Sequence, residues 1–185
     1  GDPESEPLPH KLYCIPVMQP DHQTREHDEH MPDGVFFEDR IHIAVRRMFE
    51  GSGEVPAQAP TVKVINLSIG DTAREFIHTP SPWARLLDWL AYRHRVLFCV
   101  SAGNYCDEID IGLNQQQFAA LSDGEKISAT VKAIANSLTS RRLLSPAEAT
   151  NAITVGAAHA DDSGDAHPQF GQRVDVLPSQ ALFSP

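Results

Sequence analysis

The sequence has few cysteines. The three that it contains, Cys14, Cys99 and Cys106, cannot all pair with one another. Cys14 and Cys99 lie within predicted buried strands, where a free thiol behaves as a small hydrophobic side chain. We therefore expect no disulfide framework, and the unpaired cysteines favour an intracellular, reducing compartment. Cys106 follows Asn104 closely but has no base nearby in the sequence, so we interpret it as structural.

The sequence also lacks long apolar segments and an excess of positive charge. Its longest apolar runs are about six to nine residues, whereas a membrane-spanning helix needs about twenty. No basic and apolar leader opens the sequence. Asp and Glu outnumber Lys and Arg by 25 to 15, giving a formal net charge of −10. Nucleic acids and anionic membranes require a basic surface, so neither is an expected partner.

The composition is that of a globular chain. The 185 residues are 41% hydrophobic and 22% charged, which is enough apolar material for one core. We expect a single domain over residues 1–185, with residues 1–10 as an extended lead-in. The loop over residues 19–34 holds His22, His27 and His30, but their spacing matches no established metal site, so a solvated loop is the preferred interpretation.

The most informative segment is a strand that ends in small residues and an amide. Residues 95–100 form a β-branched and aromatic run, which predicts a buried parallel strand. Ser101, Ala102 and Gly103 follow, and they leave room for another molecule to approach the backbone. Asn104 then stands at the carboxyl end of the strand, where open α/β sheets bind their ligands.

Helices alternate with strands along the rest of the chain. Apolar residues at helical spacing predict a helix from an N-cap at Asp39 to Phe49 and another from an N-cap at Ser81. The stretch 107–144 contains a capping box from Ser122 to Glu125 and predicts an inserted helix. A second capping box is predicted from Ser145 to Glu148, where it begins a short turn before the next strand. The predicted strands are Leu12–Met18, Val62–Leu67, residues 95–100, Ile153–Ala157 and Val174–Leu177.

Several of these blocks together resemble the subtilisin-like serine peptidases. The family's V-I-N-x-S-x-G strand is similar to Val64–Gly70, its A-G-N to residues 102–104, and its A-I-x-V-G-A to Ala152–Ala157, with Ser145-Pro-Ala147 before it. Further similar segments are Lys11–Val17 and Phe170–Pro178. The blocks stand in the family's order and cover most of the chain. The resemblance implies an α/β fold: a three-layer, mostly parallel sheet with helices on both faces, incomplete over these residues.

The resemblance also implies a site. Asn104 is similar to the family's oxyanion donor, whose side-chain amide stabilises the tetrahedral intermediate of peptide-bond hydrolysis. Ser68, Ile69 and Gly70 are similar to the edge along which a polypeptide substrate adds a strand. Ser101, Ala102 and Gly103 would form the opposite wall of the pocket for the substrate residue before the scissile bond. The long stretch after Asn104 departs from the family where the floor of that pocket is built.

The catalytic motifs of the family are missing from these residues. The family's Asp lies in D-[ST]-G, its His in H-G-T-H and its Ser in G-T-S-M-A, but the sequence contains neither His-Gly nor Gly-Thr-Ser. The letters D-S-G occur at Asp162-Ser163-Gly164, in a polar loop after Asn104, where no triad Asp is expected. The sequence thus resembles the central part of a serine endopeptidase domain, and we expect it to be inactive by itself.

Two alternatives to the peptidase remain open at this stage. A subtilase-like domain without catalysis would serve as a binding or scaffolding module. An unrelated doubly wound α/β binding domain would explain the strands, but not the ordered motifs, and no Gly-rich phosphate loop is present. The alternative role for Asn104 itself is to cap a strand-to-helix turn. No cofactor is implied; a structural calcium ion is common in the family, but no ligands for it can be assigned.

The predicted sheet is missing a strand. In the family, a strand that precedes the His motif separates the strands that correspond to residues 12–17 and 62–67. Unpaired backbone groups cost about 1–3 kcal/mol each when buried, so this gap cannot stay open. We expect one of three outcomes: the two strands pair directly, a second chain or flanking segment completes the sheet, or residues 12–17 leave the main sheet.

Overall fold

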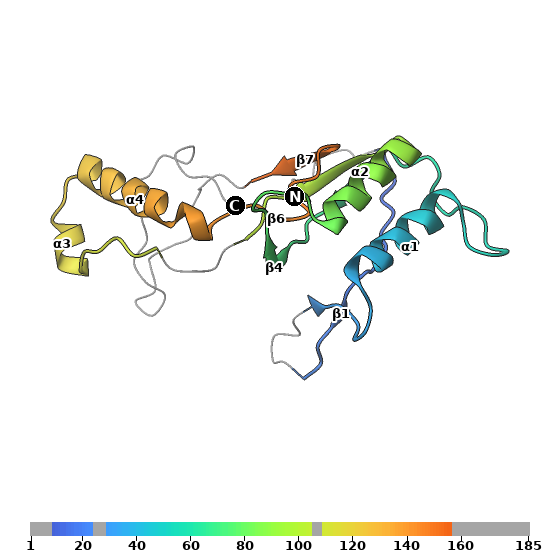
Figure 1. Ribbon diagram of the computed structural model, residues 1–185, viewed down its shortest axis with the longest axis horizontal. Coiled ribbons are helices and arrows are strands. Elements are labelled where there is room, and N and C mark those ends of the chain that lie inside the picture. The colour runs from blue at the N-terminus through green and yellow to red at the C-terminus, as the bar shows by residue number, and fades with distance from the viewer. Residues whose placement is uncertain (1–8, 24–28, 105–108, 157–185) are drawn as a thin grey trace. The chain divides into compact units, whose positions relative to one another are not determined.

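The computed structural model describes residues 9–23, 29–104 and 109–156 (Figure 1). Its internal contacts divide the chain into two units, Gly1–Lys63 and Val64–Pro185. The expectation of a single domain stays a prediction. The predicted strand Val174–Leu177, the D-S-G letters and Cys106 lie outside the described residues.

The first unit is built around helix α1, Phe37–Phe49. The helix begins two residues before the predicted N-cap, because Phe36 is the last extended residue and Asp39 lies in the first turn beside Glu38. Acidic side chains there interact favourably with the positive end of the helix dipole. A short antiparallel pair, β1 (Gln19–Pro20) and β2 (Glu29–His30), precedes the helix. The buried residues of α1 are Ile41, Ala44, Val45 and Met48.

The predicted strand Leu12–Met18 is wrong. Residues 11–17 pair with no strand in the described part of the chain, Leu12 is 89% exposed, and Cys14 is exposed as well. An apolar run becomes a strand only where a neighbouring backbone accepts and donates its hydrogen bonds, and the described residues offer this segment no such neighbour. Among the described residues this segment therefore does not pair with residues 62–67, which was the first of the three outcomes; completion of the sheet by a second chain or a flanking segment stays a prediction.

The second unit contains a parallel sheet, as predicted for an α/β fold. Its strands are β3 (Val64–Leu67), β5 (Leu97–Ser101) and β7 (Ala152–Val155), in the order β3-β5-β7. Leu67 pairs with Val100, and Ser101 with Val155. One face of the sheet is buried, with Leu67, Phe98 and Val100 all less than a tenth exposed. β5 starts two residues later than predicted, because Arg95 ends the preceding helix.

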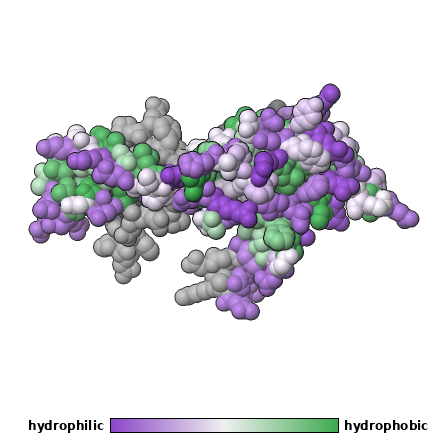
Figure 2. Space-filling view, viewed as in Figure 1, coloured by the Kyte–Doolittle hydropathy of each residue, from purple (hydrophilic) through white to green (hydrophobic). Residues whose placement is uncertain are grey.

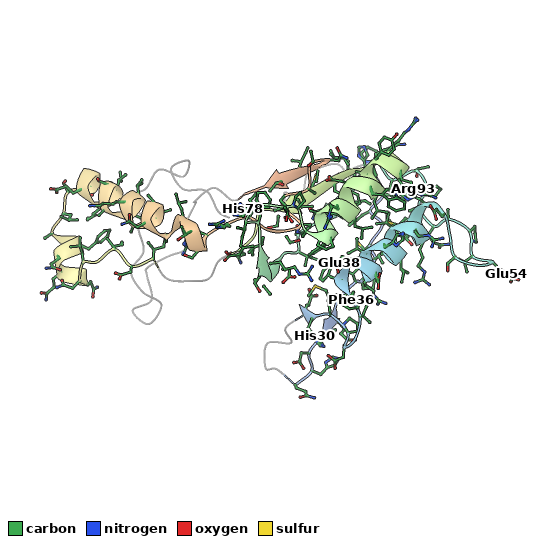
Figure 3. All side chains as sticks on the ribbon, viewed as in Figure 1. His30, Phe36, Glu38, Glu54, His78 and Arg93 are labelled. Carbon is green, nitrogen blue, oxygen red and sulfur yellow. The ribbon has the colours of Figure 1, made fainter. Side chains whose placement is uncertain are left out.

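Helix α2, Pro82–His94, covers this sheet, and it contacts β5 and β7 (Figure 1). It follows the prediction closely: Ser81 is the N-cap, and its side chain accepts a hydrogen bond from the Ala84 N–H. Its buried residues are Trp83, Ala84, Leu87, Leu90 and Ala91. At the other end, the Arg93 guanidinium lies 5.3 Å from the centre of the Trp89 ring, a cation–π contact on the exposed side (Figure 3).

Two helices occupy the predicted insertion, α3 (Gln115–Ala119) and α4 (Asp123–Ser137), followed by a 3₁₀ turn, η1 (Leu138–Ser140). The predicted capping box is present: the Glu125 carboxylate accepts from the Ser122 hydroxyl at 2.6 Å and from its N–H at 2.9 Å. These bonds to the Ser122 hydroxyl and backbone lower the pKa of Glu125. No described helix is long and apolar enough to cross a membrane.

The buried residues of α4 are Thr130 and Ala133. The apolar side chains of Val131 in α4 and Leu138 in η1 are 44% and 58% exposed. Figure 2 shows hydrophobic surface over the region of α3 and α4. A helical repeat predicts which residues share a face, but not which of two partly apolar faces is covered.

Replacing Arg95 by glycine is expected to stabilise the second unit. Arg95 caps α2 in the left-handed conformation, with φ 52° and ψ 48°, which costs an L-residue about 1 kcal/mol or more and costs glycine almost nothing. We expect Arg95→Gly to raise the free energy of unfolding by up to about 1 kcal/mol in urea denaturation.

Arg85→Gly is the matched control for this prediction. Arg85 is exposed in the middle of α2, where glycine is expected to destabilise the helix by about 1 kcal/mol. If both variants lower the unfolding free energy equally, the left-handed cap at Arg95 is not the source of strain.

Candidate functional site

The site residues predicted from the sequence meet at the carboxyl edge of the sheet. Ser68, Ile69 and Gly70 follow β3, whereas Ser101 ends β5 and Ala102 to Asn104 follow it. Because β3 and β5 are parallel neighbours and Leu67 pairs with Val100, the next residue of each strand lies at the same level of the sheet. We call residues 68–70 and 101–104 the strand-end site.

Hydrogen bonds fix the turn between Ser101 and Gly103. The Ala102 N–H donates to the Val155 carbonyl at 2.9 Å, and the Gly103 N–H donates to the Ser101 hydroxyl oxygen at 3.2 Å. The Ala102 carbonyl in turn accepts from the Leu144 N–H at 3.0 Å. The backbone before Asn104 is therefore held by the neighbouring strand β7, by the Ser101 side chain and by a segment distant in the sequence. Asn104 itself is exposed.

The distant segment, residues 143–145, crosses the strand-end site. Its strand β6 (Leu144–Ser145) pairs antiparallel with β4 (Asp71–Glu75), and the Phe76 N–H donates to the Leu143 carbonyl at 2.8 Å. We call residues 143–145 the crossing segment. Neither β4 nor β6 was predicted. β6 has two residues and leaves no period to detect, although an apolar pair, Leu143 and Leu144, precedes its Ser-Pro turn. β4 is polar except for Ala73, so it lacks the apolar alternation that predicts a strand.

Leu144 packs against both glycines of the strand-end site. Gly103 has a φ of +125°, and a methyl group there would lie 2.7 Å from Leu144 Cγ. A methyl group at Gly70 would lie 3.4 Å from Leu144 Cβ, an ordinary contact. Leu144 itself is only 1% exposed. The lack of a side chain at Gly103 thus allows a close approach that a methyl group would prevent, and the group that approaches in this structure is Leu144.

The predicted capping box from Ser145 to Glu148 has a different role. The Ser145 hydroxyl oxygen lies 2.5 Å from that of Ser81, and the Ser81 N–H donates to Glu148 Oε1 at 2.9 Å. Both side chains therefore serve the N-terminus of α2 instead of a helix of their own. The reason is local: residues 144–149 form successive turns around Pro146, so no helix begins there for Glu148 to cap. The crossing segment is tied to α2 through these contacts.

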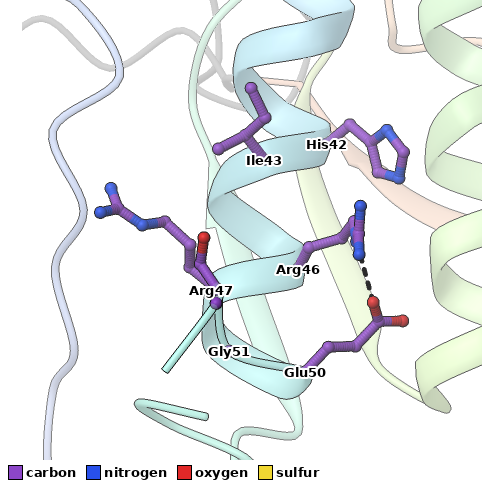
Figure 4. Close-up of a pocket in the computed structure, with 8 residues that line it drawn as sticks. His42, Ile43, Arg46, Arg47, Glu50 and Gly51 are labelled. Atoms are coloured by element: carbon purple, nitrogen blue, oxygen red, sulfur yellow. Dashed lines mark hydrogen bonds and ion pairs between the residues drawn. The ribbon is translucent and has the colours of Figure 1, made fainter. Parts of the chain in front are cut away.

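A concave pocket also lies in the first unit, on helix α1 (Figure 4). Its volume is about 310 Å³, and its polar lining comes mainly from His42, Arg46, Arg47 and Glu50. The Arg46 Nε lies 2.8 Å from Glu50 Oε2, so opposite charges face each other within it. The pocket contains none of the residues predicted for the strand-end site. No group of three His, Cys, Asp or Glu side chains suited to a metal ion occurs among the described residues.

Comparison with protein families agrees with this geometry. The model of the subtilase family, peptidase family S8, matches residues 45–176, which include all of the strand-end site and the crossing segment. The chain belongs to the subtilase family, and the family relation indicates a serine peptidase that acts on polypeptides. Comparisons with curated proteins and with solved structures gave no match. The roles of Asn104 and of the substrate-binding residues stay predictions.

The packing of Leu144 predicts different outcomes for the two glycines. Gly103→Ala places a methyl group too close to Leu144 and forces alanine into a φ that L-residues rarely adopt, so we expect a loss of more than about 1 kcal/mol of unfolding free energy. Gly70→Ala, at ordinary contact distance from the same side chain, is the control and is expected to change it by less than about 1 kcal/mol. Equal melting temperatures for the two variants would contradict this packing.

Proposed function

We propose that this chain carries the oxyanion-binding and substrate-binding part of a serine endopeptidase. In this proposal Asn104 donates its side-chain amide to the oxyanion, and the Ser, His and Asp of the triad lie outside these residues. The observation that supports it most directly is the parallel register of β3 and β5. It places Ser68–Gly70 beside Ser101–Asn104 at one sheet edge, in a chain that belongs to the subtilase family.

The chemistry assigns a role to each part of the strand-end site. Attack on the scissile carbonyl moves negative charge onto its oxygen, and a donor already aimed at that position stabilises the transition state. The three backbone contacts before Asn104 limit how far that donor can move. Residues 68–70 would pair with the substrate backbone as an added strand, which holds the scissile bond near Asn104.

A catalytically inactive relative is the second candidate function. In that case the same edge would bind peptides without cleaving them. Binding and turnover must therefore be measured separately.

The chain by itself is expected to show no turnover. It offers an oxyanion donor without a Ser nucleophile and His base in place, so a fluorogenic peptide incubated with the purified 185-residue chain should remain intact. Hydrolysis that a serine-directed inhibitor abolishes would show that a catalytic triad lies within these residues after all.

Asn104→Ala tests the oxyanion role wherever these residues occur together with the triad. We expect kcat to fall by about 10²–10³ with little change in KM, because the hydrogen bond forms mainly in the transition state; this magnitude is the one known for the corresponding subtilisin Asn and is borrowed from it. Asn136→Ala, an exposed Asn on α4, is the matched control and should leave both constants unchanged. A rise in KM with unchanged kcat would assign Asn104 to ground-state binding.

A further inference from the structure

The space between the two walls of the strand-end site is where the proposed function places a substrate side chain. One wall ends at Gly70 and the other at Gly103, and each is a residue without a side chain of its own. In the structure Leu144 lies against both glycines. A methyl group added at Gly103 would lie 2.7 Å from a side-chain carbon of Leu144, and one added at Gly70 would lie 3.4 Å from another.

We propose that Leu144 fills the pocket for the substrate residue before the scissile bond, so that the protein accepts only glycine or alanine there. The inference rests on the proposed function, because it takes residues 68–70 and 101–103 as the pocket walls. A side chain larger than a methyl group would have to occupy the volume that Leu144 already holds. The selectivity is therefore steric and needs no charged group in the pocket.

Leu144 cannot easily move aside for a larger substrate residue. Its backbone N–H is bonded to the Ala102 carbonyl, and β6 is paired with β4. The next residue, Ser145, is 1% exposed and in contact with the N-cap of α2. Displacing Leu144 would break these contacts and expose an apolar side chain that is now almost fully buried. The crossing segment thus sets a fixed depth for the pocket.

A set of binding measurements on the whole 185-residue chain tests the proposal. The probes are fluorescein-labelled peptides Ala-Ala-Ala-X with a free carboxylate, where X is Gly, Ala, Leu or Phe, and binding is followed by fluorescence anisotropy. The C-terminal carboxylate stands in for the oxyanion next to Asn104. We expect the Gly and Ala peptides to bind at least about tenfold more tightly than the Leu and Phe peptides.

Leu144→Ala should enlarge the pocket and raise the affinity for the Leu and Phe peptides by about tenfold or more. Leu90→Ala is the matched control, because Leu90 is a fully buried leucine of α2 that does not line the pocket. It removes the same atoms and should lower the melting temperature similarly, yet leave the preference for Gly and Ala unchanged. If Leu144→Ala does not fold, Leu144→Val, which removes a single carbon, is used instead. It should reduce the preference for the Gly and Ala peptides over the Leu and Phe peptides, by less than Leu144→Ala would.

The outcomes separate the two proposals. If no peptide binds the chain, whatever its last residue, the proposed peptide site itself is refuted. If all four peptides bind equally, or the Phe peptide binds best to the unaltered chain, the site stands and the role of Leu144 is refuted. An unchanged preference in a folded Leu144 variant refutes it as well.

Discussion

The contact of Leu144 with Gly70 and Gly103 is the constraint on which the second unit depends. It joins three pieces of chain that are far apart in the sequence: the end of β3, the end of β5 and the crossing segment. The packed leucine leaves no room for a side chain at Gly103, whereas a methyl group at Gly70 would meet it at ordinary contact distance. The same contact gives the strand-end site its shape, so in the proposed peptidase the packing of one side chain would affect both stability and substrate selectivity.

The crossing segment and the turn that follows it also contact α2, the helix that covers the sheet. Ser145 and Glu148 bind the N-cap residue Ser81, whose side chain also accepts from the first turn of α2. Further along the chain, just before β7, the Asn151 N–H donates to Asp88 Oδ1 at 2.6 Å, a second contact between the chain after the crossing segment and α2. The polar groups at the helix N-terminus are thus satisfied partly from a distant segment. A change at the strand-end site that displaced residues 144–148 would also loosen α2.

How much of the fold and of the strand-end site the sequence predicts depends on which interactions join residues close together in the sequence. The strands β3, β5 and β7 and the helix α2 carry their own signals: apolar runs that end in small residues, and a Ser-Pro start with an apolar stripe. The strand at residues 12–17 failed because strand pairing is supplied by a neighbour and not by the segment itself. The crossing segment was missed because its contacts join residues about forty to seventy-five positions apart, over too few residues to form a period.

The exposure of Asn104 shows what the rest of a catalytic site must add. A hydrogen bond to a developing charge is weak in water and becomes strong only where water is excluded, because the local dielectric constant is then lower. Asn104 is exposed in this structure, while the backbone that carries it is held in place. In the proposed peptidase, the bound polypeptide and the segment that bears the nucleophile must cover Asn104, so that its electrostatic contribution to catalysis arises only when substrate and triad meet at this sheet edge.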